Sequence, residues 1–144
     1  MSDAFQLDPR LKADTVPLLA LPLSLALLMD DARFPWIILV PHRPHLVEWH
    51  DLSDTDARQL HDETLLAARA LKRATACEKI NIGARGNIVR QLHVHIVARS
   101  PGDAAWPGPV WGSGARIPNE ALTRDGLVSR LAQALREEAQ RRAP

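Results

Sequence analysis

The hydrophobic pattern in the first third of the chain predicts a β-hairpin. Residues Ser24 to Met29 form a short apolar run, and the polar segment 30–33 that follows is typical of a turn. The next run, Trp36 to Val40, is continuously apolar and ends at Pro41, which is the pattern of a strand covered on both faces. The proline-containing stretch 17–22 before this hairpin is expected to be a loop.

Two later segments have helical periodicity. The first begins at Ser53, a good N-cap residue followed by acidic residues, and its apolar side chains recur at helical spacing to about Ala76. The second is expected to cover about Leu127 to Gln140, where apolar residues again fall on one face. Each helix therefore has one apolar stripe with which to pack against a neighbouring layer.

A second hairpin is predicted between these helices. Lys79 to Ile82 and Val89 to Ala98 read as strands on either side of the turn 83–86. Short connections between neighbouring strands favour antiparallel pairing. We therefore expect an α+β fold: an antiparallel sheet with one long helix after the first hairpin and a C-terminal helix. The whole chain, 1–144, is expected to form one domain, with residues 113–144 as a C-terminal helical extension.

The last predicted strand carries polar side chains on one face. Successive side chains of a strand point to opposite faces, so Gln91, His93 and His95 are expected to lie on the same face. The residues between them are apolar and are expected to face the core. An ordinary exposed strand face more often carries Thr, Lys or Glu. The pattern therefore indicates a site of hydrogen-bonding side chains on a rigid support.

Composition narrows the classes of function. The net charge is +1 with the two signs interspersed, so we expect no binding of duplex nucleic acid. The single cysteine, Cys77, excludes an intramolecular disulfide and is expected to be a small residue near a helix end. The charged first fifteen residues do not resemble a secretion signal, and the apolar stretch Val16 to Met29 is shorter than the roughly 20 residues that span a bilayer. We expect a cytoplasmic protein with no membrane partner and, without a Walker-type loop, no ATP-driven work.

Residues 91–97 read Gln-Leu-His-Val-His-Ile-Val. This segment resembles the motif of the histidine triad (HIT) proteins, His-φ-His-φ-His-φ-φ with φ apolar, except that glutamine stands at the first position. Residues 81–83, Asn-Ile-Gly, and 86–89, Gly-Asn-Ile-Val, resemble the Asn-x-Gly and glycine-rich turn of the family. Residues 105–112 are similar to a tail rich in proline and tryptophan that some members carry. The resemblance extends over about residues 5–112.

The resemblance implies a role for each histidine. His93 corresponds to the middle histidine of the triad, the nucleophile that attacks the α-phosphorus of a nucleotide and forms a nucleotidyl-imidazole intermediate, which water or another acceptor resolves. His95 corresponds to the third, which is expected to contact the phosphate and the bridging atom of the leaving group. Histidine suits this chemistry, because its ordinary pKa of about 6.5 leaves the ring mostly neutral at pH 7. A backbone carbonyl that accepts the proton of one ring nitrogen leaves the other free to attack.

The turn and the altered triad position complete the implied site. Gln91 has no titratable proton, but its amide has two donors and an acceptor, so we expect it to orient His93 or to bind a phosphate oxygen. The implied partners are a purine nucleotide or nucleotide conjugate and a second copy of the chain in a homodimer, with neither a cofactor nor a metal ion. Four residues are implied to contact ribose and phosphate, the last through its backbone N–H alone: Asn81, Gly86, Asn87 and Ile88.

Three other interpretations of the histidines remain. The first is a nucleotide-binding module that has lost turnover, which only Gln91 favours. The second is a metal-dependent hydrolase in which His93 and His95 supply two ligands. It would need a third ligand, and the residues able to provide one are His42, His45, His50, Asp30 and Asp31. The third is a structural role, with both rings hydrogen-bonded inside the core.

Three further expectations concern the surroundings of the site. The other histidines, His61 among them, stand in polar segments and are expected to be solvated. Asp30 or Asp31 is a candidate for contacting ribose hydroxyls, although turns favour Asp for local reasons. The segment Trp106 to Trp111 either covers the site, forms a subunit interface or packs on its own domain.

Overall fold

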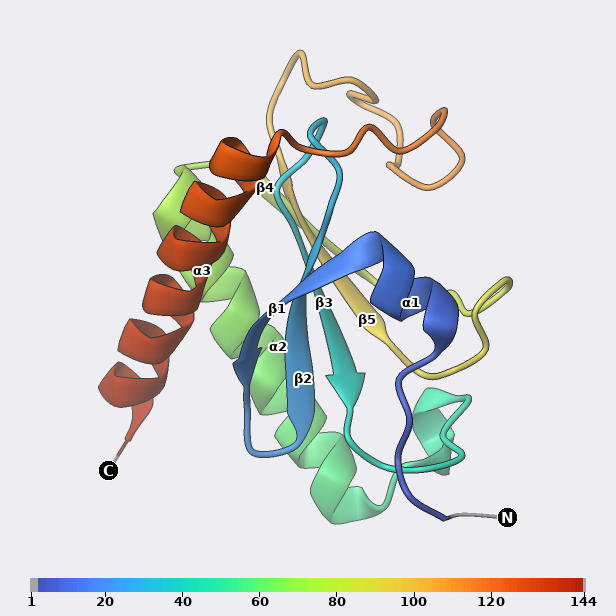
Figure 1. Ribbon diagram of the computed structural model, residues 1–144. Coiled ribbons are helices and arrows are strands. Elements are labelled where there is room, and N and C mark those ends of the chain that lie inside the picture. Colours follow the sequence, from blue (N-terminus) through green and yellow to red (C-terminus); the bar gives the residue numbers. More distant parts are fainter. Residues whose placement is uncertain (1–2, 144) are drawn as a thin grey trace.

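The computed structural model describes residues 3–143, which form one five-stranded sheet with helices on both sides (Figure 1). The strands lie in the order β1-β2-β3-β5-β4, and every neighbouring pair is antiparallel. The α+β fold with an antiparallel sheet is therefore confirmed. The elements are α1 (Pro9–Asp14), β1 (Thr15–Ala20), β2 (Ser24–Met29), β3 (Trp36–Pro41), the 3₁₀ turn η1 (Trp49–Asp51), α2 (Asp54–Thr75), β4 (Lys79–Gly83), β5 (Val94–Arg99) and α3 (Ala121–Arg142).

The first strand was not predicted, because the stretch 17–22 was interpreted as a loop. Residues Thr15–Ala20 instead pair with β2 and form one edge of the sheet. Pro17 is tolerated there because an edge strand does not need every backbone N–H for the ladder. The register shifts between Pro17 and Leu19, where a bulge accommodates the interruption.

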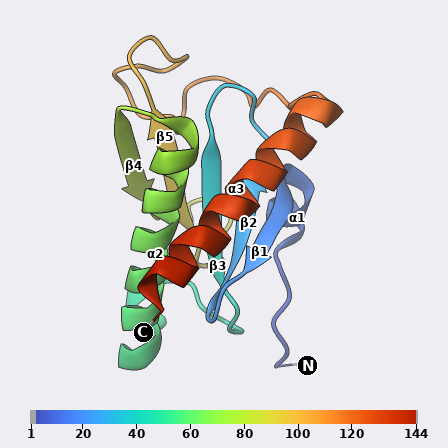
Figure 2. The same ribbon diagram turned by 90° about the vertical axis from the view of Figure 1, so that its left-hand side faces the viewer.

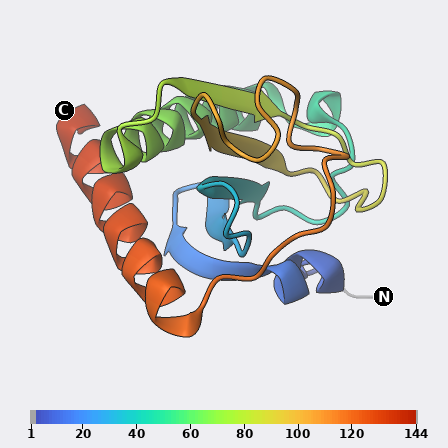
Figure 3. The same ribbon diagram turned by 90° about the horizontal axis from the view of Figure 1, so that it is seen from above.

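The two faces of the sheet have separate hydrophobic clusters. Ile37 and Leu39 of β3 point towards α2 and α3, together with Ile96 of β5. Trp36 and Ile38 point to the opposite face, where they pack near α1 and the segment that precedes α3. Figures 2 and 3 show α2 and α3 on one side of the sheet and α1 on the other. Helices thus cover one face fully, whereas a short helix and an irregular connection cover the other.

The first long helix begins and ends where local signals predict. The hydroxyl of Ser53 accepts a hydrogen bond from the backbone N–H of Asp56 at 3.1 Å, which caps the helix. Ala76 caps its C-terminal end in a left-handed conformation with φ 53°, and its backbone N–H donates to the carbonyl of Lys72. Cys77 follows directly and is buried, as expected of a small residue near a helix end.

The C-terminal helix begins earlier than the pattern predicted, at Ala121 rather than about Leu127. Its first turns are solvated, and Leu122 is 88% exposed, so they carry no apolar stripe that would reveal them in the sequence. Further along, the helix packs against α2 and the sheet, and four of its apolar residues are buried there: Leu131, Ala132, Ala134 and Leu135. Among residues 3–143, none of the helices combines the length and the apolarity needed to cross a membrane.

The last strand begins at Val94 rather than at Val89, so Gln91 and His93 do not lie in it. The partner strand β4 ends at Gly83, which pairs with His95, and on the other side the pairing with β3 ends at Val94, opposite Leu39. Strand alternation therefore applies to His95 but not to Gln91 and His93, whose positions are set by the loop before β5.

Candidate active site

A cavity of about 260 Å³ opens on the face of the sheet away from α2 and α3. It lies where β3, β5 and the turn after β4 meet α1. Both histidines of the motif line it, with three of the four turn residues implied to bind substrate. The lining residues are Arg10, Leu11, Asp14, Met29, Trp36, Ile38, Arg85, Gly86, Asn87, Ile88, Val89, His93, His95 and Trp111.

His93 stands just before β5, with its ring held by its own chain. Its Nδ1 lies 2.6 Å from the carbonyl oxygen of Gln91. A carbonyl can only accept, so Nδ1 carries the proton in this contact. When the ring is neutral, Nε2 therefore has a free lone pair. His93 is 6% exposed and lines the cavity, so it is buried among protein atoms yet not sealed from the site.

His95 points from β5 to the same face as Trp36, and its ring is held by a donor, whereas the ring of His93 is held by an acceptor. The indole Nε1–H of Trp36 donates to Nδ1 of His95 at 3.0 Å. Burial, reinforced by the neighbouring His93 and the Arg85 guanidinium, lowers the pKa of His95 to about 3. His95 is therefore neutral across the physiological range. Its ring meets that of His93 edge-on, with centroids 4.7 Å apart.

The side chain of Gln91 does not line the cavity. Its Oε1 accepts from the backbone N–H of Asp8 at 2.8 Å, and its Nε2 donates to the carbonyl of Gln6 at 2.9 Å. It thus attaches the N-terminal segment to the loop before β5. The expected orienting contact to His93 is made by the backbone carbonyl of Gln91 instead of its amide.

Asn81 lies on β4 outside the cavity, where it supports a buried arginine. Its Oδ1 accepts from Arg99, which also pairs with Asp103 at 2.7 Å and donates to the carbonyl of Gly108 at 2.8 Å. Hydrogen bonds from the Arg99 side chain hold the pKa of Asp103 down to about 2. These bonds shape the connection that brings Trp111 to the site.

Of the segment 106–111, Trp111 alone lines the cavity, where it forms one wall, and with Val110 it packs in the hydrophobic cluster on this face of the sheet. Its ring meets that of His95 edge-on at 5.5 Å. The close approach requires glycine at position 83, because a Cβ there would stand 2.9 Å from Cη2 of Trp111. This glycine has a packing role in addition to ending the strand.

Two arginines bring positive charge to the cavity. Arg10 donates from Nη1 to the carbonyl of Ile88 at 2.9 Å, and the guanidinium of Arg85 lies 6.0 Å from the ring centroid of Trp111. Within the described part of the chain, neither arginine forms an ion pair. Sequence reasoning missed Arg10 and Trp36. The register of β3 against β5 would have revealed Trp36, since Ile38 lies opposite His95 and Trp36 follows on the same face.

Asp30 and Asp31 do not line the cavity; they hold the chain before α3. Asp30 accepts from the backbone and side chain of Asn119 at 3.0 and 2.9 Å. Asp31 is buried and pairs with Arg33 at 2.8 Å. Burial raises the pKa of Asp31, but the hydrogen bonds from Arg33 outweigh it, and the net shift is downward. The carboxylates considered for ribose binding therefore have structural partners.

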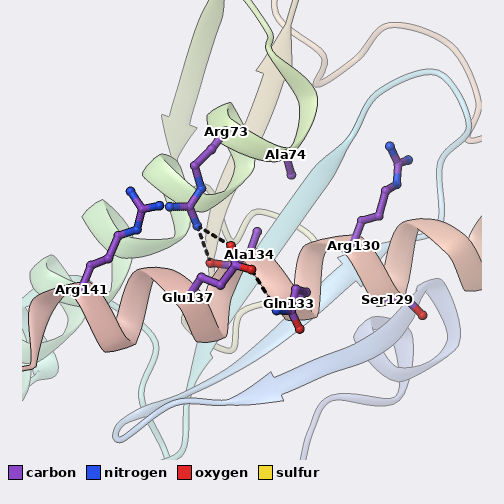
Figure 4. Close-up of a pocket in the computed structure, with 8 residues that line it drawn as sticks. All are labelled: Arg73, Ala74, Ser129, Arg130, Gln133, Ala134, Glu137 and Arg141. Carbon is purple, nitrogen blue, oxygen red and sulfur yellow. Dashed lines mark hydrogen bonds and ion pairs between the residues drawn. The ribbon is translucent and has the colours of Figure 1, made fainter.

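A larger and more open cavity of about 570 Å³ lies between α2 and α3 (Figure 4). Arg73 reaches from α2 to Glu137 and Glu138 of α3 at 3.3 and 3.2 Å. The residues lining this groove include none of the histidines and none of the turn residues. It is a gap between two packed helices with an ion-pair network.

The remaining histidines lie outside the site. All four are exposed: His42, His45, His50 and His61. Among residues 3–143, no group of three or more His, Cys, Asp or Glu side chains is arranged to hold a metal ion.

Known proteins match both the sequence and the fold. A histidine triad protein from Sinorhizobium meliloti 1021 is 48% identical, covers 90% of this chain and 96% of its own, and superposes with a TM-score of 0.88. A histidine triad protein from Marinobacter aquaeolei VT8 is 36% identical, covers 93% and 98%, and has a TM-score of 0.90.

A curated relative and a family model also match. The relative, an AP-4-A phosphorylase from Mycobacterium tuberculosis, is 32% identical over 83 residues, which are 54% of this chain and 42% of the relative. The chain thus spans less than half the length of the curated relative that it matches. The family model of the HIT domain matches residues 10–102. With the two histidines beside one cavity and the antiparallel sheet that positions them, this match shows that the chain belongs to the histidine triad family.

Proposed function

We propose that the protein is a nucleotide hydrolase or nucleotidyl transferase that acts at the α-phosphate, with His93 as the nucleophile. The observation that carries this proposal is the hydrogen bond from His93 Nδ1 to the carbonyl of Gln91. It leaves Nε2 unprotonated in the neutral ring, and that ring lines a cavity beside His95. A neutral imidazole held in one orientation is a competent covalent catalyst.

The reaction proceeds in two displacements. Nε2 of His93 attacks the α-phosphorus, a phosphorus–nitrogen bond forms, and the bond to the leaving group breaks. The ring then carries a positive charge, which Nδ1–H shares with the carbonyl of Gln91. Water, or a phosphate acceptor, attacks the phosphorus next, and the phosphorus–nitrogen bond breaks. His93 returns to its neutral form and the proton of the water passes to solvent.

The lining of the cavity fits a purine nucleotide with more than one phosphate. Its apolar wall suits a base: Leu11, Met29 and Ile38. The turn Gly86, Asn87 and Ile88 offers backbone N–H groups for phosphate oxygens, and Arg10 and Arg85 add positive charge. The name of the mycobacterial relative, AP-4-A phosphorylase, suggests a dinucleoside polyphosphate.

In this proposal Gln91 occupies the first position of the triad and acts through its backbone. Its amide holds the N-terminal segment, which carries Arg10 in α1, against the loop before β5. Asn81 contributes through Arg99 rather than through the substrate.

Mass spectrometry of the protein, quenched during turnover of diadenosine tetraphosphate, tests the proposal. We expect a nucleotidyl adduct in the wild-type protein and in His61→Ala, whose ring is exposed on α2, and none in His93→Ala. An adduct that persists in His93→Ala would refute the role of this residue.

The second candidate function is a nucleotide-binding module without turnover. The engagement of the Gln91 amide with the N-terminal segment favours it, because that amide then contributes nothing to the reacting phosphate. Calorimetric binding of the same dinucleotide with neither adduct nor product would support the module over the enzyme.

We also propose a homodimer that forms through the sheet. β4 lies at one edge of the sheet, so within residues 3–143 one side of its backbone has no strand partner, and Ile82 is 48% exposed there. Such an edge can pair with a second copy. Size exclusion with light scattering is expected to give twice the chain mass of 15.9 kDa, and a mass near 15.9 kDa would contradict the dimer.

A further inference from the structure

The contact between Trp36 and His95 determines which nitrogen of His95 carries the proton. An indole N–H can only donate a hydrogen bond. The 3.0 Å contact from Nε1 of Trp36 to Nδ1 of His95 therefore requires a bare Nδ1, and the neutral ring must carry its proton on Nε2. The two side chains are 5% and 7% exposed, so little water is available to replace this partner.

The neighbouring ring has the opposite arrangement. His93 carries its proton on Nδ1, because the carbonyl of Gln91 can only accept. The two histidines stand 4.7 Å apart and line the same cavity, yet one offers a lone pair at Nε2 and the other a proton at Nε2. This difference in tautomer distinguishes a nucleophile from a hydrogen-bond donor.

The surroundings of His95 keep it neutral. Burial disfavours a charge on its ring, and the neighbouring His93 and the Arg85 guanidinium oppose a positive charge there. Protonation of Nδ1 would also direct an N–H at the N–H of Trp36. His95 can therefore stabilise a negative oxygen by donating a hydrogen bond, but it has no extra proton to give away.

We propose that Trp36 is a positioning residue that holds His95 as a neutral Nε2–H donor, and that this fits the site to phosphoanhydride substrates rather than to phosphoramidates. The inference rests on the proposed function and adds the class of leaving group. A phosphate chain leaves as a stable anion, so it needs only a hydrogen-bond donor. An amine needs a proton as it departs.

The atoms balance on this route. Nε2 of His93 forms its bond to the α-phosphorus while the bond from phosphorus to the bridging oxygen breaks. The electron pair stays on that oxygen, which accepts a hydrogen bond from Nε2 of His95 and leaves as a phosphate anion. No proton is transferred in this step, and both nitrogens of His95 end as they began.

Nitrogen NMR of the wild-type protein tests the tautomer without any turnover. Long-range ¹⁵N–¹H spectra of the His95 ring are expected to show a protonated Nε2 and a bare Nδ1 from pH 5 to 8. A protonated Nδ1 in this range would overturn the proposal. Because it uses the wild-type protein, this measurement determines the tautomer of His95 even if substitution of the buried Trp36 prevents folding.

Kinetics with two substrates test the consequence. The wild-type kcat/KM for diadenosine tetraphosphate is expected to exceed that for adenosine 5′-phosphoramidate by at least about 100-fold, the usual contribution of a general acid that the amine lacks here. A preference for the phosphoramidate would overturn the proposed substrate class.

Trp36→Phe keeps a ring but removes the donor. We expect a mixture of both His95 tautomers and a kcat for the tetraphosphate lower by roughly 10-fold with KM unchanged, because a wrong tautomer costs orders of magnitude elsewhere. The matched control is Trp106→Phe, a 39% exposed ring outside the cavity, which should change neither. An unchanged tautomer and rate in Trp36→Phe would refute the role of Trp36. A missing His93 adduct with both substrates would instead refute the proposed function and the substrate class, leaving the tautomer to the NMR result.

Discussion

The two faces of the sheet differ in the side chains they bury, although the same strands supply both. The face under α2 and α3 receives Ile37, Leu39 and Ile96, all within one apolar cluster. The opposite face receives Trp36, and it also buries His95 and Arg99, both of which need polar partners. Hydrophobic packing therefore dominates on the first face, whereas the second face also buries polar side chains that can take part in binding and catalysis.

The layers that cover the faces differ in the same way. Two helices of 22 residues each cover the first face, and their backbones satisfy their own hydrogen bonds. The second face is covered by the six-residue α1 and by an irregular connection held by side chains such as Arg99 and Asp103. A cavity forms where this irregular layer meets the sheet. The comparison indicates that stability and function can be altered separately.

The largest expected effect is a loss of activity, on the face of the sheet that carries the cavity. His93→Ala should lower kcat/KM for diadenosine tetraphosphate by at least about 1,000-fold, or about 4 kcal/mol in transition-state free energy, because the nucleophile is lost. The free energy of unfolding should change much less, since the ring lines a cavity. Steady-state kinetics and urea unfolding measure the two effects. If the fall in activity were matched by an equal loss of folded protein, stability and function would not be separable between the two faces.

A substitution on the face under α2 and α3 should do the reverse and lower the stability while leaving the activity unchanged. Leu71→Ala removes a fully buried side chain of α2, and we expect the free energy of unfolding to fall by about 2–5 kcal/mol. The kcat of the folded protein, measured well below its melting temperature, should stay within about twofold of wild type, because Leu71 packs in the cluster on the face of the sheet opposite the cavity. A large drop in kcat at full folding would show that the two faces are coupled.

An intermediate effect is expected at the ion pair that holds the irregular layer. Asp103→Asn leaves the buried Arg99 without its charged partner and should cost about 2–3 kcal/mol of stability at pH 7. The folded-state pKa of Asp103 is about 2, below the ordinary 3.8, so its stabilisation is complete above pH 3.8 and is lost as the pH falls through about 2. Thermal melts from pH 7 to 2 should therefore show the wild type and the variant converging in acid. A constant difference would contradict the assignment.

The smallest effect is expected where the sheet touches the irregular connection, at the contact between Gly83 of β4 and Trp111. Gly83→Ala places a Cβ within 2.9 Å of Trp111, so the ring must move. We expect a loss of about 1 kcal/mol in stability from overpacking and a change of a few fold in KM, because Trp111 lines the cavity. Gly126→Ala is the control, since a Cβ there meets nothing within 4 Å. Unaltered KM with normal stability would mean that the position of Trp111 is unimportant for substrate binding.

Local signals accounted for much of the fold. The cap at Ser53, the apolar run Trp36 to Val40 and the alternation around His95 act over a few residues, so the sequence displays them directly. The strand containing Pro17 was missed because its edge position, which makes proline acceptable, is a property of the assembled sheet. The start of β5 at Val94 was missed because it depends on where the pairing with β3 and β4 ends.

The sequence by itself determined the antiparallel fold, the histidine pair and the family, because periodicity and motif spacing are written along the chain. Only the tertiary structure decided how the pair is used. The donor to His95 comes from Trp36, 59 residues away, and the side chain of Gln91 is taken up by Gln6 and Asp8 at the N-terminus. Such contacts join residues distant in sequence, and the protonation of each ring depends on the partner that folding places beside it.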